Sequence, residues 1–225
     1  MSAMGPTTEP DAVLLLRHVD AVGLVVEERT RGWDHMGAVI CDAALQPRCS
    51  YRRVVEPRVR RLVAAWPEAT TVSRFSARLE TSDIGATLPW RGPTKLRVIS
   101  DLTDALARAD VETVPDLRGA LADPAGGLRS TLRTVRRVGP KTLDYLSILC
   151  GSSEHVAVDV HVRGFVRDAG VDVATYERYG AVVRAAARLR GCSPGALDAA
   201  IWQHMSRRRQ VTGRGVIIGD VTESR

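Results

Sequence analysis

The chain has 225 residues, of which 44% are hydrophobic, a composition ordinary for one or two globular domains with a buried core. Its 32 lysines and arginines outnumber 26 aspartates and glutamates, and the formal net charge of +6 favours a polyanionic partner such as nucleic acid. No apolar run is long enough to span a membrane and no signal peptide is visible, so we expect a cytoplasmic, nucleoid-associated protein without a membrane partner.

The first half of the chain predicts a series of helices after a polar, disordered tail over residues 1–10. Apolar residues then recur at intervals of three and four, which is typical of helices with one buried face. Asp34 is the expected N-cap of the second helix, and Pro57 either starts the third helix or kinks it. The expected helices are Ala12–Val26 (with a break at Gly23), Asp34–Leu45, Tyr51–Trp66, Thr71–Leu79, Thr94–Leu106 and Pro115–Leu121.

A helical hairpin is predicted between Leu128 and Gly151. Apolar residues at helical spacing predict one helix over Leu128–Val135 and a second from Pro140 to about Cys150. Proline suits the first position of a helix, and Gly151 is placed where a helix ends in left-handed backbone. Since the connecting turn is short, the two apolar faces must pack against each other.

The last third of the chain also predicts helices. Val156, Val158, Val160 and Val162 alternate as in a strand, but no second strand is available to pair with them. We therefore expect a helix after Asp159, and the whole fold to be all-α with about ten helices. The further helices are one through Ala169 that ends at Gly170, one over Thr175–Leu189, and one from Ser193-Pro194 through Met205, followed by a basic tail over 207–225 in which Gly215–Gly219 has no assigned role.

Lys141 stands out because of where it lies and how rare lysine is. It falls in the first turn of the second hairpin helix, where free N–H groups attract phosphate and the helix dipole favours a neutral amine. Lys95 and Lys141 are the only lysines among the 32 basic residues. Arginine supplies charge but cannot lose its proton, whereas a neutral lysine amine is a nucleophile. The alternative is an ordinary phosphate contact.

Asp159 is the second candidate. It follows Lys141 by 18 residues and lies between valines, which predicts a carboxylate that is at least partly buried. A buried charge needs a partner, so Asp159 is either the N-cap of the helix that follows or a catalytic carboxylate.

The segments VGPKT (Val138–Thr142) and AVDVHV (Ala157–Val162) resemble the helix-hairpin-helix DNA glycosylases, most of all the endonuclease III branch. The signature covers roughly 35 residues, and a weaker similarity in helix order and length extends over Trp33–Met205. In that family the hairpin lysine attacks the sugar C1′ of a damaged nucleotide and the aspartate assists base departure. The resemblance assigns these roles to Lys141 and Asp159.

Two features depart from the family. Arg136-Arg137 replace the proline-glycine of the usual hairpin turn, and glycine there would permit closer backbone approach to a phosphate. The four cysteines, Cys41, Cys49, Cys150 and Cys192, lack the spacing of the iron–sulfur cluster found in many relatives, and none forms a CxxC pair. We expect no cluster and no other cofactor.

The resemblance also implies a glycosylase-like domain over residues 11–206, with two helical lobes and a cleft between them. One lobe is expected over about 34–132, the hairpin over 128–151, and the second lobe over 11–33 together with 156–206. The expected DNA contacts are the turn residues Arg136, Arg137, Val138 and Gly139, the phosphate contact Lys95, and Gln46, which would fill the gap left by an extruded base.

The function implied is a base-excision DNA glycosylase with abasic-site lyase activity. It would act as a monomer on double-stranded DNA that carries a damaged base, an oxidised pyrimidine by resemblance and oxidised guanine as the second choice. Two other functions stay open from the sequence. One is a helix-hairpin-helix protein that binds DNA without catalysis, and the other is a metal-dependent nuclease built on Asp159, His161 and His155.

Overall fold

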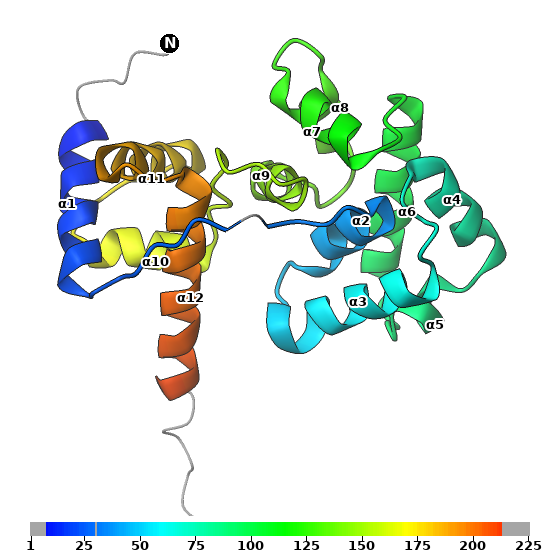
Figure 1. Ribbon diagram of the computed structural model, residues 1–225, viewed down its shortest axis with the longest axis horizontal. Coiled ribbons are helices and arrows are strands. Elements are labelled where there is room, and N and C mark those ends of the chain that lie inside the picture. Colours follow the sequence, from blue (N-terminus) through cyan, green and yellow to red (C-terminus); the bar gives the residue numbers. More distant parts are fainter. Residues whose placement is uncertain (1–7, 30, 213–225) are drawn as a thin grey trace, which may run out of the picture. The chain divides into compact units, whose positions relative to one another are not determined.

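The computed structural model describes residues 8–29 and 31–212, and every regular element in these ranges is a helix (Figure 1). The prediction of an all-α fold is confirmed for this part of the chain. Among the described helices, none combines the length and the apolar character needed to cross a membrane.

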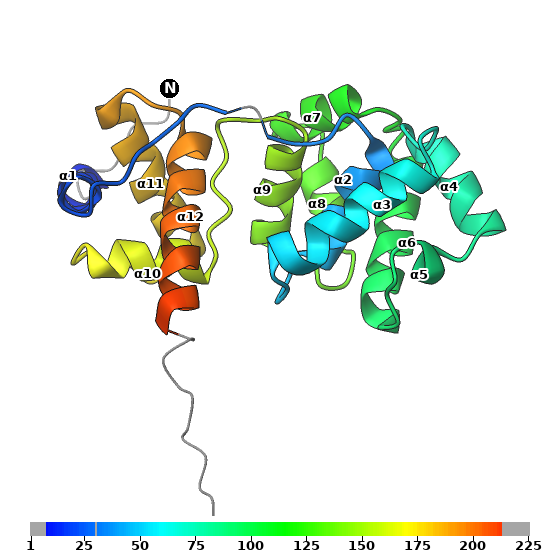
Figure 2. The same cartoon turned by 60° about the horizontal axis from the view of Figure 1, so that its bottom comes forward.

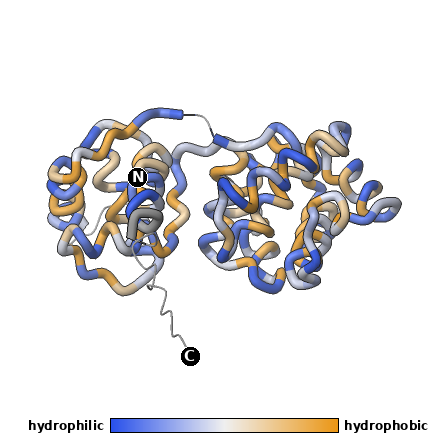
Figure 3. Tube along the Cα trace, turned by 90° about the horizontal axis from the view of Figure 1, so that it is seen from below, coloured by the Kyte–Doolittle hydropathy of each residue, from blue (hydrophilic) through white to orange (hydrophobic). Residues whose placement is uncertain are grey.

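The chain divides into two compact units. Unit 1 combines the residues up to Glu28 with those from Val158 onward, and unit 2 is the continuous segment Arg29–Ala157. The hairpin lies wholly within unit 2. Hydrophobic and hydrophilic residues are interspersed along the trace of each unit (Figure 3), as expected where most helices bury one face.

Unit 2 is built around one buried helix, α2 (Met36–Leu45), all of whose residues are buried. The helices α3, α4, α6 and α9 pack directly against it. The elements after α2 are the π-helical turn η1 (Tyr51–Val55), α3 (Glu56–Ala65), α4 (Val72–Thr81), α5 (Ile84–Thr87), α6 (Pro93–Arg108), α7 (Val114–Ala122), α8 (Leu128–Arg133) and α9 (Pro140–Leu149).

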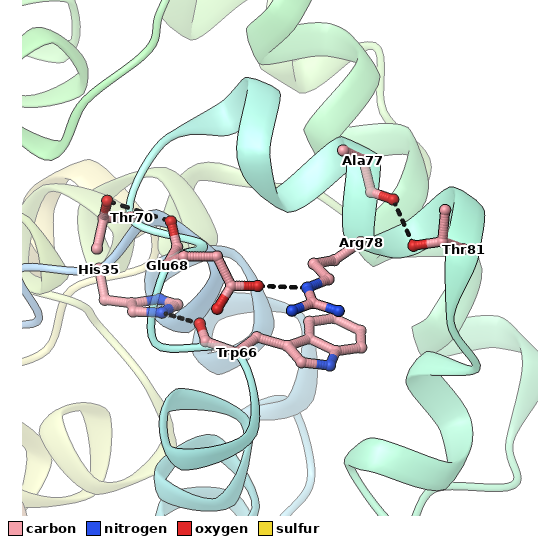
Figure 4. A network of polar contacts seen from close by, with 7 residues as sticks. All are labelled: His35, Trp66, Glu68, Thr70, Ala77, Arg78 and Thr81. Atoms are coloured by element: carbon pink, nitrogen blue, oxygen red, sulfur yellow. Dashed lines mark hydrogen bonds and ion pairs between the residues drawn. The ribbon is translucent and has the colours of Figure 1, made fainter.

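The start of α2 differs from the prediction. His35, not Asp34, is the N-cap: the Ala38 N–H donates to its Nδ1 at 3.1 Å. Nδ1 is therefore the acceptor, so Nε2 carries the proton and donates to the Trp66 carbonyl at 2.9 Å (Figure 4). Since Trp66 lies at the end of α3, the same ring fixes the start of one helix against the end of another.

The predicted helix Tyr51–Trp66 consists of two elements, η1 and α3. Pro57 lies in the first turn of α3, where a missing N–H leaves no hydrogen bond unmade. The helix expected to begin at Thr94 starts at Pro93, with Gly92 as its N-cap.

The predicted helical hairpin is confirmed. α8 and α9 pack against each other, with Leu128 and Leu132 of α8 and Leu143 and Leu146 of α9 buried in the core. Gly151 follows α9 with a φ of +83°, in the left-handed region that glycine adopts without strain.

Unit 1 contains α1 (Thr8–Ala21), α10 (Val160–Asp168), α11 (Tyr176–Arg190) and α12 (Pro194–Thr212). α1 packs against α11, and α12 packs against α10 and α11 (Figure 2). The early and late segments of the chain therefore share one core.

The predicted tails, residues 1–10 and 207–225, were both too long, because helices extend into each of them. Thr8–Pro10 belong to α1, because helix formation begins before the apolar stretch that marked its start in the sequence. α1 also ends at Ala21, before Gly23 with its φ of +62°, and does not continue to Val26. At the other end, α12 continues to Thr212. Residues 1–7 and the segment Gly215–Gly219 lie outside the described residues.

As predicted, the alternating valines do not form a strand. Val156 and Val158 are buried in a segment without regular secondary structure, and α10 begins directly after Asp159. The predicted helix end is also confirmed, since Gly170 follows α10 with a φ of +78°.

Candidate functional site

Lys141 lies in the first turn of α9. The N-cap of this helix is Gly139, which has no side chain to occupy the free N–H groups, and Pro140 opens the first turn. The Lys141 side chain is half-buried, and its Nζ donates a hydrogen bond to Gln46 Oε1. The structure thus brings together two residues that the sequence analysis selected for separate reasons.

Two residues from each of the facing helices α2 and α9 form a connected group that includes Lys141. Gln46 is the C-cap of α2 and lies one turn after Asp42, while Tyr145 lies one turn after Lys141 on α9. The Tyr145 hydroxyl donates to Asp42 Oδ1 at 2.9 Å, and the centroid of its ring lies 5.7 Å from Lys141 Nζ. We call Asp42, Gln46, Lys141 and Tyr145 the α2–α9 clamp. Because Asp42 pairs with Tyr145 and Gln46 with Lys141, the two helices run antiparallel at this point.

Asp42 anchors the clamp from inside the core. Its carboxylate is fully buried and accepts hydrogen bonds from Tyr145, from Trp33 Nε1 at 2.9 Å and from Tyr51. Burial raises the pKa of the Asp42 carboxyl to about 6, although the three hydrogen bonds lower it. Burial also raises the pKa of the Tyr145 hydroxyl well above its usual value, and the neighbouring Asp42 charge raises it further.

Sequence reasoning missed Asp42. The signal was a single carboxylate in the otherwise apolar helix Met36–Leu45, where an unpaired charge is costly. Its hydrogen-bond donors come from residues 33, 51 and 145, which the sequence does not connect.

In the hairpin turn, an arginine adopts a backbone conformation that usually requires glycine. Arg137 has a φ of +72°, in the left-handed region that costs a residue with a Cβ about 1–2 kcal/mol. Arg136 and Arg137 are exposed, whereas Val138 packs into the core and its N–H donates to the Val135 carbonyl at 3.1 Å. The turn therefore presents two guanidinium groups to solvent beside the start of α9.

Lys95 lies in the first turn of α6 and reaches the C-terminal end of α2. Its Nζ donates to the carbonyl oxygens of Leu45 and of Pro47, the latter at 2.8 Å, and lies 3.2 Å from Cys49 Sγ. A cation at this place offsets the negative end of the α2 dipole and satisfies its last carbonyls. A phosphate contact by Lys95 would have to replace one of these bonds.

Asp159 belongs to unit 1, whereas Lys141 belongs to unit 2. The half-buried Asp159 is the N-cap of α10: Oδ1 accepts from the backbone N–H of His161 at 2.8 Å and of Val162 at 3.1 Å. Its Oδ2 accepts no hydrogen bond from the described residues. The structural role foreseen for this residue is therefore confirmed, and one carboxylate oxygen is left for another partner.

The residues of the metal-nuclease alternative have other contacts. His155 Nδ1 lies 2.8 Å from the Ser152 hydroxyl, and the His161 ring lies edge-on to Trp202 with centroids 6.1 Å apart. Within the described ranges, no group of three or more histidine, cysteine or acidic side chains is arranged to hold a metal ion.

Residues 31–206 match the model of a family described as a domain of unknown function, DUF8548, and the chain belongs to this family. The match includes Lys141, Asp159 and the whole α2–α9 clamp. No curated protein and no solved structure matches the chain.

Proposed function

We propose that this protein is a DNA glycosylase with abasic-site lyase activity, in which Lys141 is the nucleophile. The observation that carries the proposal is the placement of the Lys141 amine at the start of α9, held by Gln46 of α2 and lying near the Tyr145 ring. An amine in the first turn of a helix lies beside free N–H groups that attract phosphate, so the backbone of a DNA strand would come within its reach.

The proposed reaction removes the damaged base and then cuts the strand. The base is extruded from the duplex, because its glycosidic bond is out of reach inside the stack. As that bond breaks, positive charge develops on the sugar, and the Asp159 carboxylate stabilises it through the oxygen that α10 does not use. The Lys141 amine adds to C1′, and the base leaves with the bonding electron pair and a proton. Loss of the C2′ proton from the resulting Schiff base then expels the 3′ phosphate and cuts the strand.

The DNA contacts belong to the same proposal. The exposed Arg136 and Arg137 and the N–H groups from Gly139 onward, at the start of α9, hold the strand at the hairpin turn, whereas the Val138 N–H is already bonded to the Val135 carbonyl. Gln46 leaves the amine and enters the gap in the duplex when DNA binds. The two helical lobes with a cleft, known from helix-hairpin-helix glycosylases, are the arrangement in which Lys141 and Asp159 reach one deoxyribose. An oxidised pyrimidine is the lesion that the resemblance favours.

Borohydride trapping on a duplex with one abasic site tests the proposal. The wild-type protein should form a covalent adduct, and Lys141→Gln should form none. Lys141→Arg should also fail, because it keeps the charge but not the nucleophilic amine. Lys95→Arg is the matched control and should still form the adduct, since it leaves Lys141 as the only lysine. An adduct with Lys141→Gln would contradict the assignment.

Asp159→Asn isolates the carboxylate charge, because asparagine caps a helix as well as aspartate does. Base release by this variant should fall about a hundredfold or more, the usual loss when one group that stabilises transition-state charge is removed. DNA affinity should change little, and equal losses of both would count against a catalytic role.

A second candidate is a DNA-binding protein without lyase activity. It is favoured by the hairpin turn, where Arg137 in left-handed backbone replaces the usual glycine. Binding of abasic DNA without adduct or strand cleavage would identify it.

A further inference from the structure

Unit 2 contains a pocket of about 500 Å³ that none of the proposed catalytic residues lines. It lies between the end of α2, the start of α6 and the hairpin turn. Its volume is in the range of about 300–1,000 Å³ typical of small-molecule sites. The lining residues are Ala43, Ala44, Pro47, Arg48, Cys49, Trp90, Gly92, Thr94, Lys95, Val98, Arg137 and Thr142.

The walls and the rim of the pocket differ in character. Ala43, Ala44 and Val98 are buried core residues with small side chains, and together with Pro47 and Trp90 they give the pocket a mostly apolar wall. The exposed residues Arg48, Thr94 and Arg137 line it as well. A pocket of this kind fits a ligand with an apolar body and a polar or charged end.

The two arginines point to an anion. Neither guanidinium makes a hydrogen bond or an ion pair with any residue that the structure describes, and each has five N–H donors. Both residues also have left-handed backbone, with a φ of +61° at Arg48 and +72° at Arg137. Two strained residues with unused cationic groups on one pocket are typical of a ligand site, where strain is retained for function.

Phosphate is the anion that this arrangement suits best. A guanidinium group can donate two parallel hydrogen bonds to two oxygens of one phosphate. The hydroxyls of Thr94 and Thr142, which also line the pocket, add neutral donors. Lys95 does not compete for it, because its ammonium is directed at the carbonyls of Leu45 and Pro47. A nucleotide combines the two parts, because its base can stack on an aromatic side chain such as Trp90 and its phosphate can pair with guanidinium groups.

We propose that this pocket binds a nucleoside monophosphate, with the base against Trp90 and Val98 and the phosphate between Arg48 and Arg137. The nucleotide is either free or the 5′-phosphorylated end of a DNA strand, and both present the same chemistry. The inference shares Arg137 with the proposed DNA contacts, but it does not rest on the proposed lyase reaction, because it involves neither Lys141 nor Asp159.

Calorimetric titration of the full-length protein tests the proposal. AMP should bind at least about tenfold more tightly than adenosine or inorganic phosphate, since each of these lacks half of the ligand. A single-stranded oligonucleotide with a 5′ phosphate distinguishes the two sources: tighter binding than AMP assigns the pocket to a strand end, and weaker binding assigns it to the free nucleotide. Absence of binding by both would overturn the proposal.

Substitutions in the pocket test whether the nucleotide binds there. The double variant Arg48→Gln, Arg137→Gln should lose at least about tenfold in affinity for the bound nucleotide. Thr94→Trp should lose binding as well, because it fills the pocket from an exposed position that the core does not need. Arg133→Gln removes an exposed arginine of α8 outside the pocket and should bind as the wild type does. Unchanged affinity in the first two variants would contradict the proposal.

A measurement on the unaltered protein guards against variants that fail to fold. Phenylglyoxal modifies exposed arginines, and mass spectrometry maps the modified positions. Bound nucleotide should protect Arg48 and Arg137 and leave Arg133 as reactive as before. Equal modification of all three with and without nucleotide would overturn the assignment of the site.

Discussion

Arg137 carries a conformational cost that a single substitution would remove. Arg137→Gly should raise the free energy of unfolding by up to about 1 kcal/mol, because relief of left-handed strain outweighs the greater entropy of glycine in the unfolded chain. Urea denaturation at neutral pH measures the difference.

Arg136→Gly is the matched control for this prediction. Arg136 is equally exposed and lies in the same turn, but its φ is not positive. Glycine there should lower stability by up to about 1 kcal/mol, because only the entropic cost applies. Equal effects of the two substitutions would show that the φ of Arg137 is not a source of strain.

Asp42 should make stability depend on pH in an unusual direction. The folded protein binds this proton more tightly than the unfolded chain does, since burial raises the pKa of the carboxyl from 3.8 to about 6. Its contribution is therefore fully present below about pH 4 and is lost as the pH rises through 6, a change of about 3 kcal/mol.

Asp42→Asn removes this titration and keeps the shape of the side chain. In urea denaturation between about pH 3 and pH 7, the wild-type protein should lose about 3 kcal/mol relative to the variant. Other groups titrate equally in both proteins, so the difference isolates Asp42. Parallel pH profiles would mean that the carboxyl has an ordinary pKa in the fold.

At the scale of the helices, Lys95 joins α6 to the end of α2. Lys95→Met keeps the apolar stem but leaves the carbonyls of Leu45 and Pro47 without their donor, so stability should fall by about 1–3 kcal/mol. Arg97→Met, at an exposed position of the same helix, should be close to neutral. If Lys95 served mainly as a phosphate contact, its variant would instead keep its stability and lose DNA affinity.

The helix ends were predictable where capping residues close in the sequence determine them. Thr71, Asp159 and Thr175 cap α4, α10 and α11 with their own side chains, and Gly151 and Gly170 follow helices in left-handed backbone. These signals act over a few residues, so the sequence alone contains them. The start of α2 was placed wrongly because His35 also bonds the distant Trp66 carbonyl, and the sequence does not show that contact.

The candidate site was predictable only in part, for the same reason. Lys141 and Asp159 were chosen from position and spacing, and the structure adds the contact of Lys141 with Gln46. Asp42 could not be assigned a role, because Trp33, Tyr51 and Tyr145 come together around it only when α2, η1 and α9 pack. Long-range packing therefore decides what local patterns leave open.

For the whole molecule, the division into units predicts separate folding. The described core of unit 2 runs from Met36 to Cys150 and is closed within that unit. A fragment over Arg29–Ala157 should therefore unfold cooperatively in thermal denaturation followed by circular dichroism. A fragment that begins at Val158 should not, because α11 then lacks α1, against which it packs. A cooperative transition in the second fragment alone would contradict this division.

The split of unit 1 along the chain has a consequence for synthesis on the ribosome. α1 emerges before unit 2, yet its partner α11 begins only at Tyr176, after the whole of unit 2. At about 5–20 residues per second, α1 waits on the order of ten seconds or more with the apolar side chains of Ala12, Leu15 and Val19 uncovered. During that interval the nascent chain offers a binding site for holding chaperones, and slower translation of the middle segment would lengthen its exposure to aggregation.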